Sequence, residues 1–266
     1  MTEDFTEEEL AKGIHDAVED RLNSHVGQHK KPQAFLIVGQ PGAGKTMLAN
    51  MLTGYLEQDV VFVSGDDFRA YHPRYEKLYE EFGADFVLHT QKFAGKMTDG
   101  IIKELAKQGR NLIIEGTMRT KDVPENTCKM LKKMGYDVAL FAMLVRPEIS
   151  YLSTLKRFEL MKEIGGIPRK TPKEHHDKVV KAIVDNLDAV HQDQVFDRIT
   201  IYNRQEERLY DSRETPHRSP ASVFRKEFGR MLSTKEKKDI RQEYTKYAGK
   251  KVVEMTLRQY EKGART

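Results

Sequence analysis

Eight residues between positions 39 and 46 have the types and the spacing of a loop that binds phosphate groups. The stretch reads Gly39, Gln40, Pro41, Gly42, Ala43, Gly44, Lys45 and Thr46. Its glycines let the backbone turn without side-chain clashes, so that N–H groups can point inward at a phosphate. The lysine supplies a cation for the β- and γ-phosphates, and the final hydroxyl group is a natural ligand for Mg²⁺. The pattern therefore predicts an ATP site, with Thr46 as a magnesium ligand.

Two adjacent carboxylates, Asp66 and Asp67, follow an apolar run at 60–63. A carboxylate in that place can accept the proton of an attacking hydroxyl group or orient that group. Because successive side chains of an extended chain alternate in direction, we expect one aspartate to face the phosphates and the other to face away. A polar turn with a capping aspartate is the alternative interpretation.

A third cluster, Glu115, Thr117 and Arg119, follows the apolar run at 111–114. It brings a carboxylate, a hydroxyl group and a guanidinium group to the same region. A buried glutamate is costly unless it is paired, and a substrate hydroxyl group or Arg119 would supply the partner. A purely structural Glu–Arg pair in a loop is the alternative.

Two arginines lie near a glycine-containing loop, Arg157 on a predicted helix and Arg169 in the loop itself. Phosphoryl transfer places charge on the equatorial oxygens of the γ-phosphoryl group, and arginines from a mobile lid neutralise such charge. Taken alone, each arginine is more often a surface cation. His175 and His176 follow, but neighbouring residues on a helix diverge, so we interpret them as non-ligands.

The elements that must position these residues alternate between short apolar runs and helical patterns. The predicted strands are 34–38, 60–63, 111–114, 136–144 and 199–202. The predicted helices are 7–22, 46–56, 75–82, 86–107, 124–134, 149–162 and 172–191. This alternation predicts a P-loop kinase-like, three-layer α/β/α fold with a mostly parallel sheet. The carboxyl ends of the strands then meet at one edge, where ligands usually bind.

The chain divides into a P-loop kinase domain, residues 1–219, and a C-terminal helical extension, residues 220–266. The domain includes an N-terminal helix at 6–22, for which Thr6 and Glu9 form a capping box. The extension is rich in Lys, Glu and Arg with spaced apolar residues. We expect one or two amphipathic helices there, packed on the domain or on a partner, and a solvated face explains their charges better than nucleic-acid binding.

Composition narrows the class of protein. The chain has 266 residues, 38% of them apolar, which suffices for a sizeable core, and its formal net charge of +4 requires no nucleic-acid partner. The single cysteine, Cys128, cannot form an internal disulfide or a multi-thiolate metal site, and we interpret it as an ordinary small residue on a helix. Without a signal-peptide core or an apolar run of about 18 residues, we expect a cytoplasmic protein without membrane contact.

A P-loop alone does not separate a kinase from a GTPase or a motor ATPase. The chain lacks a convincing Asn-Lys-x-Asp motif for guanine and a strand that ends in the usual Walker B aspartate. Its length and its second cluster of polar residues favour a kinase that acts on a small molecule.

Together these motifs resemble those of the zeta toxin family, including its pneumococcal-type members. The matching stretches are 34–46, 65–69, 72–73, 93–97, 111–119, 122–124, 150–154, 171–177 and 202–204. They occur in order and with the correct spacing over roughly residues 4–215, so the resemblance is far more specific than the P-loop alone.

The resemblance implies the toxin of a toxin–antitoxin system, a kinase for the 3′-hydroxyl group of the amino sugar in UDP-N-acetylglucosamine. Its product would interfere with cell-wall precursor synthesis. By the same resemblance, Asp66 holds the position of the catalytic base, and Lys45 and Thr46 handle ATP and Mg²⁺. The positions that match sugar-nucleotide ligands are Asp99, Glu115, Thr117 and Arg119, and those that grip the transferring phosphate are Arg157 and Arg169. An antitoxin would bind near the N-terminal helix and block the ATP site.

Two other functions stay open. One is a P-loop kinase for another acceptor, such as an antibiotic or a polynucleotide end, although only the basic tail favours nucleic acid. The other is a nucleotide-dependent binding module with slow or no catalysis. The presence of Lys45, Thr46, Asp66, Arg157 and Arg169 argues against the second.

Overall fold

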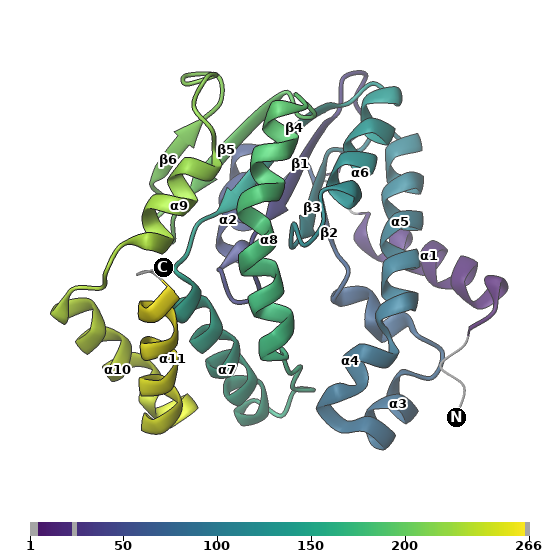
Figure 1. Cartoon of the computed structure of the whole chain (residues 1–266). Helices are drawn as coiled ribbons and strands as arrows, with labels where there is room; N and C mark the ends of the chain where they lie inside the picture. The colour runs from purple at the N-terminus through teal and green to yellow at the C-terminus, as the bar shows by residue number, and fades with distance from the viewer. Residues whose placement is uncertain (1–4, 23–25, 264–266) are drawn as a thin grey trace.

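A six-stranded sheet forms the centre of the molecule (Figure 1). The structure, a computed structural model, describes residues 5–22 and 26–263. The strands are β1 Gln33–Val38, β2 Val61–Ser64, β3 Leu112–Gly116, β4 Asp137–Met143, β5 Arg198–Tyr202 and β6 Arg208–Asp211. Their order is β2-β3-β1-β4-β5-β6, and β1 to β5 are parallel, as predicted. The sequence analysis missed β6, which pairs antiparallel with β5.

Helices cover the sheet and extend beyond it. They are α1 Glu7–Arg21, α2 Lys45–Tyr55, α3 Tyr75–Phe82, α4 Phe86–His89, α5 Gln91–Lys107, α6 Asp122–Lys133, α7 Pro147–Glu163, α8 Lys173–Gln192, α9 Ala221–Gly229, α10 Thr234–Ala248 and α11 Lys250–Gly263, with 3-10 helices η1 Asp67–Tyr71 and η2 Gly83–Asp85. The capping box predicted for α1 is present, since Thr6 and Glu9 each accept a hydrogen bond from the other's backbone. In the part of the chain described, no helix has both the length and the apolar character needed to cross a membrane.

One predicted helix, 86–107, is divided into α4 and α5 at Thr90. The buried hydroxyl group of Thr90 donates to the Phe86 carbonyl oxygen at 3.1 Å and accepts from the Arg69 guanidinium group at 2.9 Å. A threonine side chain bonded to nearby backbone competes with continued helix formation. The break therefore follows from a contact with η1, which helical periodicity does not reveal.

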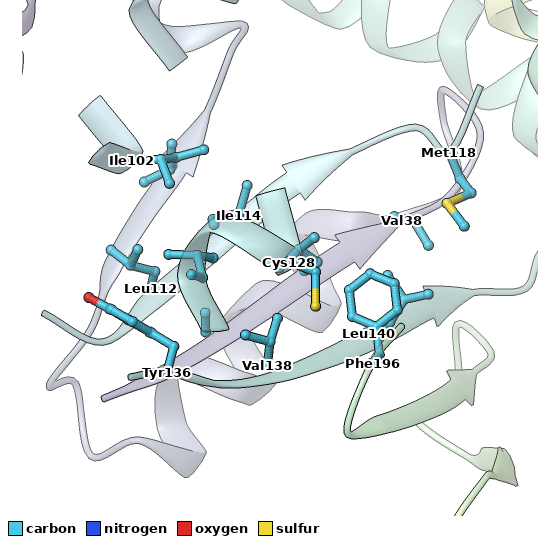
Figure 2. Close-up of a cluster of buried hydrophobic side chains, with 14 of the residues drawn as sticks. Val38, Ile102, Leu112, Ile114, Met118, Cys128, Tyr136, Val138, Leu140 and Phe196 are labelled. Atoms are coloured by element: carbon cyan, nitrogen blue, oxygen red, sulfur yellow. The ribbon is translucent and has the colours of Figure 1, made fainter. Parts of the chain in front are cut away.

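Apolar side chains alternate between the two faces of the sheet. Leu36 and Leu140 join the cluster beneath α5, α6 and α8, whereas Ile37 and Phe141 join the cluster beneath α2. Figure 2 shows part of the first cluster, including Cys128. The Cys128 thiol is buried and donates to a backbone carbonyl, and burial raises its pKa to about 11, consistent with a small core residue. Burial of each large apolar side chain contributes about 2 kcal/mol before entropy is counted.

The C-terminal segment forms three helices, so the prediction of one or two was too low. A capping box of Ser233 and Glu236 starts α10, and Gly249, with a φ of 77°, separates α10 from α11. Phe224 of α9 joins the main core, whereas Tyr244 of α10 and Leu257 of α11 pack with α7 in a separate cluster. Of the two packing partners considered, the helices therefore contact the chain's own domain.

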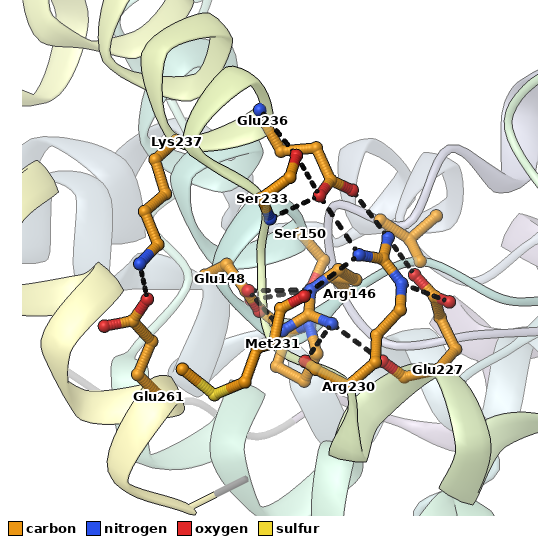
Figure 3. Close-up of polar contacts among 12 residues, drawn as sticks. Arg146, Glu148, Ser150, Glu227, Arg230, Met231, Ser233, Glu236, Lys237 and Glu261 are labelled. Atoms are coloured by element: carbon orange, nitrogen blue, oxygen red, sulfur yellow. Dashed lines mark hydrogen bonds and ion pairs between the residues drawn. The ribbon is translucent and has the colours of Figure 1, made fainter.

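A buried ion pair joins the end of β4 to these helices (Figure 3). Arg146 and Glu148 are almost fully buried, with 2.7 Å between Nε and Oε1. Arg146 also donates to the backbone carbonyl oxygens of Glu227 and Arg230, each at 2.8 Å. The predicted domain boundary at residue 219 stays a prediction. Residues 1–4 of the first predicted domain and residues 264–266 of the C-terminal extension lie outside the described ranges.

Candidate active site

The P-loop follows β1 at the centre of the sheet, where the neighbouring strands are β3 and β4. The connection after β1 leads past β3 to β2, whereas the connection after β3 leads past β1 to β4, and such a reversal opens a crevice at the carboxyl ends of the strands. β2 and β3 end at the same edge, since Ser64 is paired with Glu115 and Val38 with Gly116. The topology therefore brings the clusters at 66–67 and 115–119 beside the P-loop.

Two glycines of the P-loop have backbone conformations that other residues rarely adopt. Gly42 has a φ of 75° and Gly44 a φ of 97°. A Cβ atom at Gly42 would lie 2.1 Å from the carbonyl oxygen of Ser150, so only glycine fits. No side chain caps the start of α2. Its first N–H groups are thus available to an anion, as a phosphate site requires.

Side chains from distant segments hold the P-loop in place. Gln40 is fully buried, and its amide donates to the Val145 carbonyl oxygen at 2.6 Å. Arg204 donates to the carbonyl oxygens of both Gly42 and Ala43. Arg204 was not among the predicted site residues, although it ends the matching stretch 202–204. The contact of Arg204 with the P-loop could not be predicted from motif spacing, because Arg204 lies 161 positions after Ala43 in the sequence.

Lys45 and Glu115 meet beneath the P-loop. The ammonium group of Lys45 donates to the Gly39 carbonyl oxygen at 3.1 Å and lies 3.4 Å from Glu115 Oε1. Both residues are largely shielded from solvent. The effective dielectric constant around them is therefore lower than at the surface, and their electrostatic attraction is stronger than that of a surface pair. Arg119 was one of the two partners expected for Glu115, but among the described residues the ion pair of Glu115 is with the P-loop lysine.

The two aspartates after β2 point in different directions. Asp66 lines the cavity beside the P-loop, whereas Asp67 lies 3.8 Å from Arg21 of α1. The divergence was predicted, but its stated reason was wrong. Asp66 has helical φ and ψ of −66° and −32°, and Asp67 begins η1, so a helical turn separates them rather than strand alternation.

Three arginines surround Asp66. Burial raises the pKa of this carboxyl group, but the nearby Arg69, Arg169 and Arg157 more than offset burial and lower it below the ordinary value. Arg69 Nε is 3.0 Å from Asp66 Oδ1, and Arg169 Nη1 is 3.6 Å from Oδ2. Asp66 is therefore ionised at neutral pH and can accept a proton or a hydrogen bond.

Arg157 and Arg169 both line the P-loop cavity, as predicted from their placement around a lid. Arg157 donates to the Thr171 hydroxyl group at 3.3 Å, and Arg169 donates to the Asp66 backbone carbonyl oxygen at 3.1 Å. The segment between α7 and α8 thus crosses the cavity and reaches the end of β2. Two guanidinium groups therefore line the cavity beside the P-loop and give it positive charge.

Two adjoining cavities meet at this edge of the sheet. The P-loop cavity, lined by Lys45 and Asp66, has a volume of about 350 Å³. The cavity beside it, lined by Asp99 and Arg119, has a volume of about 310 Å³, and we call it the acceptor cavity after the predicted role of these two residues. Glu115, Thr117 and His175 line both. A group bound in one cavity therefore lies next to a group bound in the other.

The acceptor cavity contains every residue predicted to bind the sugar nucleotide. Its wall includes Asp99, Glu115, Thr117 and Arg119, together with apolar side chains such as Ile102. Burial raises the pKa of Asp99. Arg119 makes no ion pair with any residue in the described part of the chain, so its charge is available to an anionic ligand.

The two histidines lie in different surroundings, and their interpretation as non-ligands stays a prediction. His176 is fully buried, with Nε2 2.8 Å from Ser150 Oγ and Nδ1 3.1 Å from Asp177 Oδ1. His175 lines both cavities, and burial, Arg119 and Lys178 lower its pKa, so it is neutral at pH 7. Among the described residues, no cluster of three or more His, Cys, Asp or Glu side chains could hold a metal ion.

Comparisons with known proteins agree on one family. The sequence model of the family described as "Zeta toxin" matches residues 15–215. Toxin PezT of Streptococcus pneumoniae is 41% identical over 217 residues, which cover 80% of this chain and 84% of the relative. Toxin zeta of Streptococcus pyogenes is 38% identical over 233 residues, covering 87% of this chain and 81% of the relative.

Solved structures extend the similarity to the C-terminal helices. A structure from the PezAT chromosomal toxin–antitoxin system of Streptococcus pneumoniae superimposes with a TM-score of 0.80 at 35% identity, covering 97% of this chain and 98% of that one. A structure of an AvrRxo1-ORF1:-ORF2 complex has a TM-score of 0.59 at 14% identity, covering 95% and 83%, and shares the fold alone.

Proposed function

The chain belongs to the zeta toxin family, and from that premise we propose that it transfers the γ-phosphoryl group of ATP to UDP-N-acetylglucosamine. The acceptor atom is the 3′-hydroxyl oxygen of the amino sugar. One observation carries the proposal: the P-loop cavity opens into a second cavity through shared walls, and Glu115 in those walls contacts Lys45. Donor and acceptor would then lie side by side.

Asp66 is the proposed general base. Its ionised carboxylate accepts the proton of the attacking hydroxyl group as the new oxygen–phosphorus bond forms and the bond to the ADP oxygen breaks. The lowered pKa makes Asp66 a weak base, which suits a loose transition state in which the proton leaves late. Arg157 and Arg169 stabilise the charge on the equatorial oxygens.

The P-loop is the proposed binding site for the phosphates of ATP. The free N–H groups at the start of α2 and the ammonium group of Lys45 hold the β- and γ-phosphates. Magnesium carried by a nucleotide needs only one or two protein ligands besides the phosphates. The exposed Thr46 in the first turn of α2 fits that need. The ion would neutralise charge on the phosphates.

The acceptor cavity supplies contacts suited to a sugar nucleotide. The unpaired guanidinium group of Arg119 is available to the diphosphate of UDP. Asp99 and Thr117 offer a carboxylate and a hydroxyl group to the sugar. Apolar residues such as Ile102 and Met118 suit the flat faces of the uracil and sugar rings.

We also propose that the protein is the toxin of a toxin–antitoxin system. Its relatives are named toxins, and one solved relative comes from a toxin–antitoxin system. Near α1, Asp20 accepts a hydrogen bond from Tyr71 at 2.6 Å, and Arg21 pairs with Asp67 next to the base. An antitoxin bound over α1 would therefore border the edge of the site that holds Asp66 and Asp67. That it also blocks ATP is part of the proposal and rests on the family resemblance.

The roles of the two aspartates can be tested with a matched pair of variants. Asp66→Asn keeps the shape of the side chain but removes the base, so phosphoryl transfer should fall by about three orders of magnitude while ATP binding persists. Asp67→Asn changes the same charge one residue away and should keep most of the turnover. Normal turnover in Asp66→Asn, or loss only in Asp67→Asn, would move the base to Asp67.

A further inference from the structure

Met118 has a backbone conformation that is unusual for a buried residue. Its φ is 60°, in the left-handed region that residues with a Cβ atom rarely adopt. Four other non-glycine residues in the described part of the chain have a positive φ, and each is an exposed Glu or Gln. Met118 differs from them because it is only 3% exposed and belongs to the core cluster beneath α5, α6 and α8 (Figure 2). A conformation of this kind persists only where surrounding contacts hold it.

Met118 lies two residues after the end of β3, between two residues of the acceptor cavity. Thr117 and Arg119 both line that cavity. The carbonyl group of Met118 and the backbone nitrogen of Arg119 belong to one planar peptide unit. The direction of the Met118 carbonyl group therefore determines how the backbone enters Arg119, and with it the region that the guanidinium group can reach.

Asn186 of α8 holds this peptide unit. Its side-chain amide donates to the Met118 carbonyl oxygen at 2.9 Å, although the two residues lie 68 positions apart in the sequence. Asn186 is only partly buried, and it lines neither the P-loop cavity nor the acceptor cavity. We infer that Asn186 is a positioning residue, which sets the orientation of Arg119 toward the acceptor. The inference rests on the proposed function and deepens it.

A second contact joins the same segment to α8, but it lies at the surface. Lys121 pairs with Asp193 at 3.0 Å, and their side chains are 41% and 50% exposed. Exposed ion pairs contribute little, because solvent screens the charges and two long side chains lose conformational freedom. The hydrogen bond from Asn186 is partly buried and acts on the peptide unit of Arg119 itself. Its loss should therefore matter more to the acceptor cavity than loss of the surface pair.

Kinetics with separate readouts for donor and acceptor test this role. Asn186→Ala removes the amide from a partly exposed helical position, where alanine favours the helix. The KM for UDP-N-acetylglucosamine should rise about fivefold, which corresponds to one hydrogen bond of about 1 kcal/mol. The KM for MgATP and the hydrolysis of ATP without acceptor should stay unchanged. Asp185→Ala, at the exposed neighbouring side chain on α8, is the matched control and should change none of these values.

A double-mutant cycle shows whether Asn186 acts through Arg119. Arg119→Ala alone is expected to raise the KM for the sugar nucleotide about tenfold. The double variant Asn186→Ala/Arg119→Ala should stay near that tenfold value, because the group that Asn186 orients is already absent. A rise of about fiftyfold, the product of the two single effects, would overturn the inference, since the two residues would then act independently.

The remaining outcomes also decide the question. An unchanged KM for the sugar nucleotide in Asn186→Ala would overturn the inference. Equal losses of acceptor affinity and of ATP hydrolysis would overturn it too, because Asn186 would then serve only the stability of the fold. A wild-type protein that hydrolyses ATP but leaves the sugar nucleotide unmodified would refute the proposed function, and the inference with it, so the two failures are distinguishable.

Discussion

Removing the hydroxyl group of Tyr260 is expected to weaken the hold of α11 on the body of the protein. That hydroxyl group donates to Asp177 Oδ1 at 2.5 Å, and Lys173 donates to Oδ2 at 2.6 Å. Burial raises the pKa of Asp177, but hydrogen bonds from Lys173, Tyr260 and His176 more than offset burial and lower it to about 2. Asp177 of α8 thus connects that helix to α11 through the hydrogen bond from Tyr260.

The magnitude follows from the pKa. Lowering the pKa of Asp177 from 3.8 to about 2 corresponds to about 2 kcal/mol of stabilisation of the folded, ionised form. Tyr260 supplies one of the main hydrogen bonds. Tyr260→Phe should therefore lower the free energy of unfolding by about 1 kcal/mol near pH 7, since the aromatic ring and its packing remain.

A double-mutant cycle measures this contact. Urea unfolding of the wild type, Tyr260→Phe, Asp177→Asn and the double variant should give a coupling energy of about 1 kcal/mol. Tyr247→Phe on α10 is the matched control, because the Tyr247 hydroxyl group makes no hydrogen bond within the described residues. Strictly additive effects of Tyr260→Phe and Asp177→Asn would refute the reasoning.

The pH dependence gives a second check on the same residue. Because the folded pKa lies below the unfolded value, the stabilisation from Asp177 is complete above about pH 4 and is lost as the pH falls toward 2. Between about pH 5 and pH 3, the wild type should lose more stability than Asp177→Asn. Equal losses would assign the acid sensitivity to other carboxylates.

Three further predictions concern the candidate site. Gly42→Ala should weaken ATP binding at least about tenfold, because a methyl group would meet a backbone carbonyl oxygen of α7; calorimetric affinity near that of the wild type would contradict this. Arg119→Ala should raise the KM for the sugar nucleotide about tenfold or more without altering ATP hydrolysis, whereas Arg225→Ala, at an exposed side chain of α9, should change neither. Equal effects on both activities would remove Arg119 from the acceptor site. Arg69→Gln should shift the acid limb of the kcat/KM profile to higher pH, since loss of this cation raises the pKa of Asp66; an unshifted limb would exclude Asp66 as the titrating base.

The sequence was sufficient for those parts of the fold that local rules determine. Glycine spacing, followed by a helix, predicted the P-loop, and apolar runs alternating with helices predicted β1 to β5 and their parallel direction, although not their order. The edge strand β6 was missed because only two of its four residues are buried and Arg208 and Asp211 at its ends are charged. Its pairing with β5 comes from tertiary context, which overrides weak strand propensity.

For the site residues too, the positions set by the strands could be predicted, whereas the contacts set by tertiary packing could not. Asp66, Glu115 and Arg119 were expected at one edge because each follows a parallel strand, and they line the cavities there. The partner of Glu115 and the role of Arg204 could not be predicted, because contacts between residues far apart in sequence depend on how the helices pack. The packing of the C-terminal helices could not be predicted either, because their amphipathic pattern does not indicate which surface they cover.

The central claim is that this chain phosphorylates UDP-N-acetylglucosamine. The most direct measurement is mass spectrometry of that sugar nucleotide after incubation with the protein and MgATP, with fragmentation to locate any added phosphate. The account predicts one phosphate on the amino sugar, and no such product with Asp66→Asn. An unmodified sugar nucleotide, from protein that binds ATP normally, would contradict the account and leave a P-loop kinase with another acceptor.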